Sequence, residues 1–171
     1  MEMSVVMGAI ILICIFTIIF IKQKKFDAGK HYDEMQLKIR GDGYRLSYFV
    51  TVMCMVALSF GYEMGLERFV SPAFGIFATL MLGIVIFPIY CIVKEVFFPL
   101  GQKGRYYIVL CAIVVVINGG VGVMHIMDGT VIQNGKLVFE YGSNLVCAAA
   151  FAALLITLAC KTVYNKRRDD R

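Results

Sequence analysis

The sequence predicts an all-α integral membrane protein, a bundle of five transmembrane helices with the N-terminus outside and the C-terminus inside. Of its 171 residues, 60% are hydrophobic and only 17% are charged, whereas soluble domains are nearer half apolar and a quarter charged. The apolar residues gather in five long blocks, and most Lys and Arg residues lie in alternate connections between those blocks. We expect a single membrane domain over residues 1–171, with a short interfacial helix and a small outer β-hairpin.

Each block is predicted to form one spanning helix. None contains Asp, Glu, Lys or Arg, and a charge at mid-helix costs about 2.5–3.5 kcal/mol to insert. A hydrocarbon core about 30 Å thick needs about 20 apolar residues of helix, a length that the blocks approach or exceed. The blocks are residues 5–21, 46–62, 72–93, 106–124 and 145–159. The first could instead be a signal peptide, but no Lys or Arg precedes it and no small-residue cleavage site follows, which favours a retained helix.

The distribution of positive charge predicts the orientation. Of the 17 Lys and Arg residues, 15 lie in residues 22–45, in the connection after the third block and in the C-terminal tail. These are alternate segments, so a chain that crosses the membrane five times places all three on one side. That side has 15 basic and 7 acidic residues, and the other side has 2 basic and 5 acidic residues. Positive residues are retained in the cytoplasm, so this side is predicted to be inside. The lipid bilayer is the expected partner of this charge, and nucleic acid is not, because no base-reading module is recognisable.

The inner juxtamembrane segment, residues 22–45, is the longest polar stretch. Three of its apolar residues share a helical face, which predicts a short helix over about residues 31–40, ended by Gly41 and Gly43. Two interpretations stay open: a linker that lies in the inner membrane interface, or a docking surface for a cytoplasmic or membrane partner. The docking candidates are Tyr32, Met35, Ile39, Arg40 and Tyr44.

The same segment resembles a pattern found in uncharacterised small multi-pass membrane proteins of Gram-positive bacteria. Those proteins have a YDERQ-like motif and then an RGKAY-like motif just before a helix. Here residues 32–36 read YDEMQ and residues 40–44 read RGDGY, so Met35 and Asp42 replace the Arg and the Lys of the two motifs. The match covers about a dozen residues. Because that family has no established activity, the resemblance implies only a small protein of a bacterial cytoplasmic membrane.

The outer loop, residues 128–142, is predicted to form a β-hairpin. Asn134-Gly135 stands between two β-prone runs, and a type I′ turn needs positive φ at both central residues. The hairpin could be a lid that closes the bundle or a recognition element for an outside ligand.

Small and polar residues within the blocks mark packing sites and candidate ligand sites. Ser71, Gly75, Thr79 and Gly83 recur every four residues, as in closely packed membrane helices. In the fourth block, Asn118 is expected either to hydrogen-bond to another helix or to mark a local unwinding that meets a ligand. Near its outer end, two titratable residues could bind a cation or sense pH, or could simply be solvated. The ligand-pocket candidates are Asn118, Gly119, Gly120, His125 and Asp128.

The sequence shows no pattern typical of catalysis. The six cysteines lie in or at the ends of apolar blocks without a Cys-x-x-Cys pair, so neither a metal site nor a cofactor is expected. No hydrolase, zinc-protease or nucleotide-binding motif is present, and no charge lies mid-membrane. We therefore expect a non-enzymatic accessory, regulatory or immunity-type interaction subunit, with homo-oligomer formation left open. The alternative is a small-solute binding or transport component with a pocket near the fourth helix.

Overall fold

The computed structural model describes residues 32–98 and 105–169. The first predicted span, residues 5–21, and the first ten residues of the juxtamembrane segment lie outside these ranges. All the helices and strands described below belong to one unit, Glu34–Arg171.

Four long helices make up most of this unit, and each is long and apolar enough to cross a membrane. They contain the second to fifth predicted blocks, so these four blocks are confirmed as helices. The helix predicted for the first block and the orientation in the membrane remain predictions. The elements in chain order are α2 (Glu34–Glu63), the short 3-10 helix η1 (Leu66–Arg68), α3 (Pro72–Val93), α4 (Arg105–Met127), β1 (Ile132–Gln133), β2 (Lys136–Leu137) and α5 (Phe139–Asp169).

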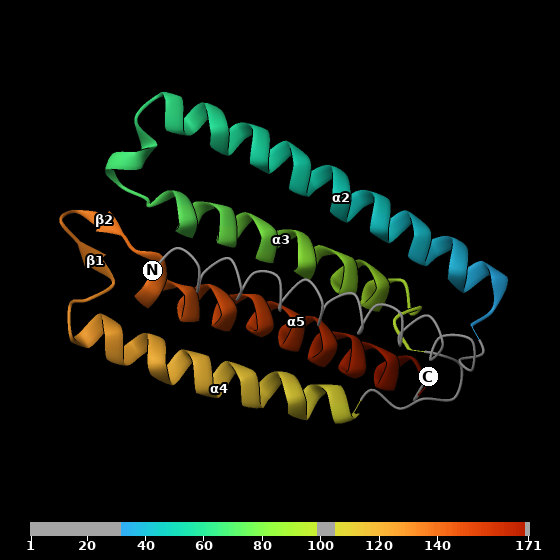
Figure 1. Ribbon diagram of the computed structural model, residues 1–171. Helices are drawn as coiled ribbons and strands as arrows, with labels where there is room; N and C mark the ends of the chain where they lie inside the picture. Colours follow the sequence, from blue (N-terminus) through green and yellow to red (C-terminus); the bar gives the residue numbers. More distant parts are fainter. Residues whose placement is uncertain (1–31, 99–104, 170–171) are drawn as a thin grey trace, which may run out of the picture. The chain divides into compact units, whose positions relative to one another are not determined.

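The helices do not pack in chain order. α2 packs against α3, α3 against α5, and α5 against α4, so the last helix lies between the third and the fourth (Figure 1). Ile92 of α3, Cys111 of α4 and Leu158 of α5 form a buried apolar cluster where these three helices meet. Many other large apolar side chains remain exposed, which is the pattern expected of helices that face lipid.

The α2–α3 interface is built on the predicted stripe of small residues. Gly75, Thr79 and Gly83 of α3 are buried, and a Cβ atom at Gly75 or Gly83 would collide with the side chain of Tyr62 or Thr51 of α2. Close approach of this kind is how small residues stabilise helix pairs in lipid, where no hydrophobic effect drives association. The predicted packing role of the stripe is therefore confirmed.

The prediction of a separate short helix before the second block is wrong. α2 is one helix of 30 residues that continues through Gly41 and Gly43, and neither glycine has a positive φ. Gly43 is buried, and a Cβ atom there would lie 2.9 Å from Tyr90 Cδ1 and 3.5 Å from Cys91 Sγ. This glycine allows α2 to approach α3 closely and does not end the helix.

The predicted hairpin is present as a two-stranded antiparallel sheet. Ile132 pairs with Leu137, and the turn residues Asn134 and Gly135 have φ values of 51° and 77°, as a type I′ turn requires. The Leu137 N–H donates to the Phe69 carbonyl at 2.7 Å, and its carbonyl accepts from Ser71 N–H at 3.0 Å. The hairpin is thus fixed to the α2–α3 connection; the side of the membrane on which it lies remains a prediction.

Candidate functional site

The described charges gather at opposite ends of the helices. One end, which we call the basic end, contains the start of α2, the end of α3 and the end of α5, and its basic residues are Lys38, Arg40, Arg45, Lys94, Lys161, Lys166, Arg167 and Arg168. The hairpin end has two basic residues and four acidic ones, which are Arg68, Lys136, Glu63, Glu67, Asp128 and Glu140. The basic end is the more unusual of the two because a short segment there joins the end of α3 to the three other long helices that the structure describes.

This segment, residues 95–98, we call the junction segment. It begins where α3 ends: the Val96 N–H donates to the Cys91 carbonyl at 2.9 Å, and the Glu95 N–H donates to the Ile92 carbonyl at 3.1 Å. The pattern is a Schellman motif, whose left-handed position is usually glycine. Here Glu95 takes it, with φ of 61°, at a cost of about 1–2 kcal/mol for a residue with a side chain.

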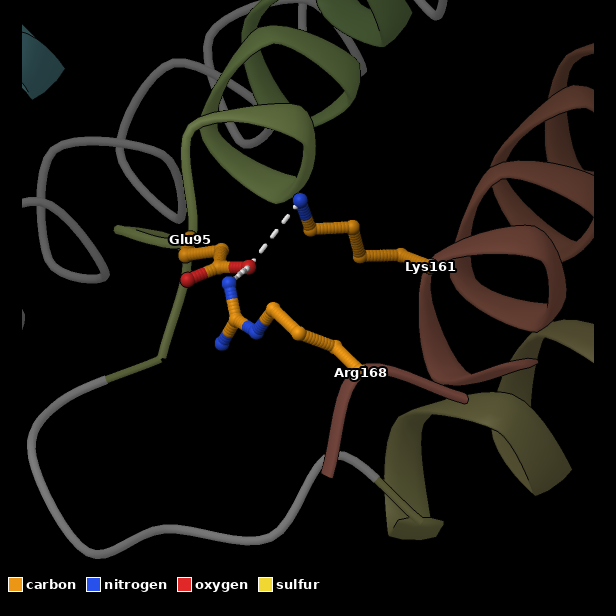
Figure 2. Close-up of polar contacts among 3 residues, drawn as sticks. All are labelled: Glu95, Lys161 and Arg168. Carbon is orange, nitrogen blue, oxygen red and sulfur yellow. Dashed lines mark ion pairs between the residues drawn. The ribbon is translucent and has the colours of Figure 1, made fainter. Parts of the chain in front are cut away.

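The Glu95 carboxylate contacts α5 (Figure 2). Its Oε1 lies 3.0 Å from Lys161 Nζ and 3.8 Å from Arg168 Nη1, and Asn165 is close enough to help lower the pKa of this carboxyl group. The three α5 residues lie on one face, because they are spaced at i, i+4 and i+7. The hydrogen bond from Lys161 is the main reason that the pKa of Glu95 is lowered from its usual value, so the carboxylate is ionised at neutral pH.

These ion pairs contribute little net stability. The side chains of Glu95, Lys161 and Arg168 are 42%, 25% and 59% exposed, and ion pairs that remain in contact with water contribute about 0.2–1 kcal/mol each. That gain is similar to the backbone cost of the left-handed conformation at Glu95. The contact is therefore close to energetic balance and would be sensitive to a competing anion.

Arg40 joins α2 to the same segment. Its Nη1 donates to the Val96 carbonyl at 3.3 Å and to the Phe97 carbonyl at 3.2 Å. The guanidinium also lies over the Phe87 ring, 5.5 Å from its centroid, within the range of a cation–π interaction. The start of α2 is thus held against the end of α3 by a charged side chain.

Aromatic side chains complete the junction on the α4 side. The rings of Phe97 and Phe98 lie 5.9 Å and 5.1 Å from the Tyr107 ring, and both phenylalanines pack against the buried cluster of α3, α4 and α5. The junction segment therefore contacts α2 through Arg40, α5 through Glu95 and α4 through its aromatic rings.

The structure separates the predicted docking residues. Arg40 contacts the junction segment, and Tyr44 stacks on Phe87 with ring centroids 3.9 Å apart. Met35 is 69% exposed, Ile39 is half-buried, and Tyr32 lies in the irregular segment before α2. The predicted set is therefore not one outward face, because two of its members pack within the chain.

The predicted pocket residues in α4 do not converge. The Asn118 amide donates to the Val114 carbonyl of the same helix at 3.0 Å, and α4 is continuous through Gly119 and Gly120. Neither an interhelical bond from Asn118 nor a local unwinding occurs in this described helix. A Cβ atom at Gly119 would lie 3.9 Å from Ala148 of α5, and one at Gly120 would meet open space.

His125 is part of the hairpin attachment. Its Nδ1 lies 3.3 Å from Thr130 Oγ1, which also donates to the His125 carbonyl at 3.1 Å, and its ring is 4.9 Å from the Tyr141 ring. Asp128 is exposed. His125 is about 10 Å along the helix axis from Asn118, because seven residues separate them.

Sequence analysis did not identify Glu95 as a site residue. One signal was available: Glu95 follows an apolar block within a basic connection. An acidic residue at a helix C-terminus is unfavourable beside the negative end of the helix dipole, unless cations contact it. Which cations do so depends on the packing of α5 beside α3, which the sequence pattern does not show.

Comparison with known proteins reveals no relative. No protein-family model, curated protein or solved structure matches this chain. The geometry of the described residues is therefore the basis for a functional proposal.

Proposed function

We propose that this chain is a non-enzymatic multi-pass protein of a bacterial cytoplasmic membrane that acts as an accessory, regulatory or immunity-type interaction subunit. Its partner binds the first three turns of α2, on the cytoplasmic side. The observation that supports this most is the length of α2 together with its attachment to the junction segment.

α2 is longer than a membrane crossing requires. Its 30 residues span about 45 Å at 1.5 Å per residue, against a hydrocarbon core about 30 Å thick. Its apolar part begins at residue 46, and residues 34–45 include five charged side chains. These turns therefore extend beyond the hydrocarbon core at the basic end. Because they continue a spanning helix, they project from the membrane and do not lie flat along it.

The outward face of these turns offers a mixed surface. Four exposed residues of alternating charge lie on these turns, and two apolar side chains of the same turns, Met35 and Leu37, are 69% and 55% exposed. Arg40 already fixes the position of the helix, so a partner would lose little free energy in ordering it. The four charged residues are Glu34, Lys38, Asp42 and Arg45.

Site-specific cross-linking in the cells that produce the protein tests this proposal. A photo-reactive residue at Lys38 should cross-link to one partner in the wild-type background, and Met35→Ser with Leu37→Ser should abolish the product. Met64→Ser is the matched control, because Met64 is 89% exposed but lies beyond the other end of α2. The proposal fails if no product forms, or if the double variant and the control form it equally.

The alternative, a small-solute binding or transport component, lacks a supporting contact among the described residues. It requires polar groups that converge beside α4. Asn118 instead bonds within its own helix, and Gly120 faces open space. We therefore place the interaction role first.

A further inference from the structure

We propose that Lys161, Asn165 and Arg168 form a binding site for the phosphate of an anionic lipid head group, and that Glu95 occupies this site in the conformation described here. We call these three residues the α5 anion site. The inference concerns the lipid and not a protein partner, so it does not depend on the proposed function.

The α5 anion site already holds an anion. One carboxylate oxygen of Glu95 forms ion pairs with Lys161 at 3.0 Å and with Arg168 at 3.8 Å. Both cationic side chains extend to it from α5 (Figure 2). Lysine, arginine and side-chain amide groups donate hydrogen bonds to phosphate oxygens as they do to carboxylate oxygens. A lipid phosphate diester has a single negative charge, as Glu95 does, so an exchange leaves the net charge at the site unchanged.

The depth of the site fits a lipid phosphate. The apolar part of α5 ends at residue 160, and Lys161 is the first charged residue after it. Arg168 is seven residues further, or about 10 Å along the axis. The head-group layer on one side of a bilayer is roughly 5–8 Å thick, from a total of about 40–45 Å around a core of about 30 Å. The two cations therefore span the layer in which phosphate groups lie.

Glu95 is an occupant that a competing anion can displace. Its left-handed backbone conformation opposes the gain from its ion pairs, and its contact with Arg168 is long and exposed. Once released, the carboxylate would be solvated and would need no new partner. Arginine binds phosphate in a bidentate manner, so at Arg168 the exchange replaces one long contact with two short ones, while the phosphate takes the place of the carboxylate at Lys161.

Release of Glu95 would alter the junction segment. The segment would lose its ion pairs with α5 but keep the hydrogen bonds from Arg40 to Val96 and Phe97. Anionic lipid would thereby loosen α5 from the α3–α4 connection, while the attachment of α2 stays in place.

Native mass spectrometry of the full chain, released from bilayers of phosphatidylglycerol and phosphatidylethanolamine, tests this inference. We expect Glu95→Gln to raise the number of retained phosphatidylglycerol molecules several-fold, because it removes the competing negative charge from the site without changing the side-chain shape. Lys161→Gln or Arg168→Gln should remove the retention of phosphatidylglycerol at this site, and Lys161→Arg should preserve it. Arg167→Gln is the matched control, since it removes the same charge from the adjacent residue of α5.

Three outcomes would overturn the inference. One is that Glu95→Gln leaves phosphatidylglycerol retention unchanged. Another is that Arg167→Gln lowers retention as much as Arg168→Gln, which would show a general attraction to the basic end. The third concerns the source of the phosphate: inorganic phosphate added to the protein in neutral detergent should bind far more weakly, and equal binding would exclude a lipid-specific site.

Discussion

The two ends of the helices are held together by different forces. At the hairpin end, backbone groups make the connections: Leu137 bonds to Phe69 and Ser71. At the basic end, charged side chains do so: Arg40 binds the carbonyls of the junction segment, and Glu95 contacts Lys161. Backbone bonds respond little to salt or to other ions, whereas exposed ion pairs are screened and exchangeable. The hairpin end is therefore expected to be the fixed end of the molecule and the basic end the adjustable one.

The largest expected effect comes from disrupting the helix packing close to the hairpin end. Gly75→Leu places a side chain where the Tyr62 ring lies and should break the bond from the Tyr62 hydroxyl to the Ser71 carbonyl. Overpacking of this kind costs about 1–3 kcal/mol, to be measured as a lower thermal unfolding midpoint in detergent. Gly120→Leu is the control, because that position faces open space; an equal loss there would contradict the assigned packing.

Arg40→Met should destabilise the basic end by about 1–3 kcal/mol, because it removes two hydrogen bonds to the junction segment and each contributes about 0.5–1.5 kcal/mol. Because the lost contact lies at the basic end, hydrogen exchange should rise at the start of α2 and not at the hairpin. High salt should reduce the difference from the wild-type protein only partly, because neutral carbonyls accept these bonds. Faster exchange at both ends would show that the two ends are not independent.

Two glycines with open space around them should respond with opposite signs. Gly135→Ala should destabilise the hairpin by about 1 kcal/mol, because φ at this turn position is 77°. Gly41→Ala should instead stabilise the protein by about 0.5–1 kcal/mol, because Gly41 lies inside α2 with no atom within 4 Å of an added Cβ. Thermal unfolding midpoints of the two variants test these expectations. A lower midpoint for Gly41→Ala would support a helix end at Gly41 and contradict the continuous α2.

The smallest effect is expected at Glu95. Glu95→Gln should cost at most about 1 kcal/mol, and Glu95→Gly should be the more stable of the two variants. Glycine also loses the ion pairs with α5, but it relieves the left-handed conformation at this position. If the glycine variant unfolds at the lower temperature, the backbone strain assigned to Glu95 is wrong.

The difference in stability between the wild-type protein and Glu95→Gln should also depend on pH. The pKa of Glu95 is lowered in the folded protein, mainly by the hydrogen bond from Lys161. Its contribution to stability is therefore fully present above about pH 4.5, its usual pKa, and is lost as the pH falls through the lowered value. The wild-type protein and Glu95→Gln should become equally stable in acid, as followed by unfolding midpoints from pH 7 down to pH 3.

The sequence predicted the features that depend on local pattern. Charge-free blocks predicted the four described helices that are long and apolar enough to cross a membrane, Asn134-Gly135 predicted the hairpin turn, and the small residues from Ser71 to Gly83 predicted the packing face of α3. Each of these follows from properties of neighbouring residues: the cost of burying charge, the φ values that a turn needs, and helical spacing.

The sequence did not predict features that depend on which helices are neighbours. The sequence predicts a helix end at Gly43 because glycine occurs both at C-caps and at close helix contacts, and only the position of Tyr90 distinguishes the two. Glu95 was missed because its partners lie on α5, more than 60 residues further along the chain. Of the predicted docking residues, Met35 is exposed, but Arg40 contacts the junction segment and Tyr44 stacks on Phe87 of α3.

The orientation of the two ends is the claim on which the proposed cytoplasmic interaction surface depends, and cysteine labelling measures it directly. In a variant whose six native cysteines are replaced, single cysteines at Lys38 and Lys166 mark the basic end and one at Asn134 marks the hairpin. With a membrane-impermeant maleimide, Asn134→Cys should react in intact cells, and Lys38→Cys and Lys166→Cys only after the membrane is opened. Labelling of the two basic-end cysteines in intact cells, with protection of the hairpin cysteine, would contradict the account.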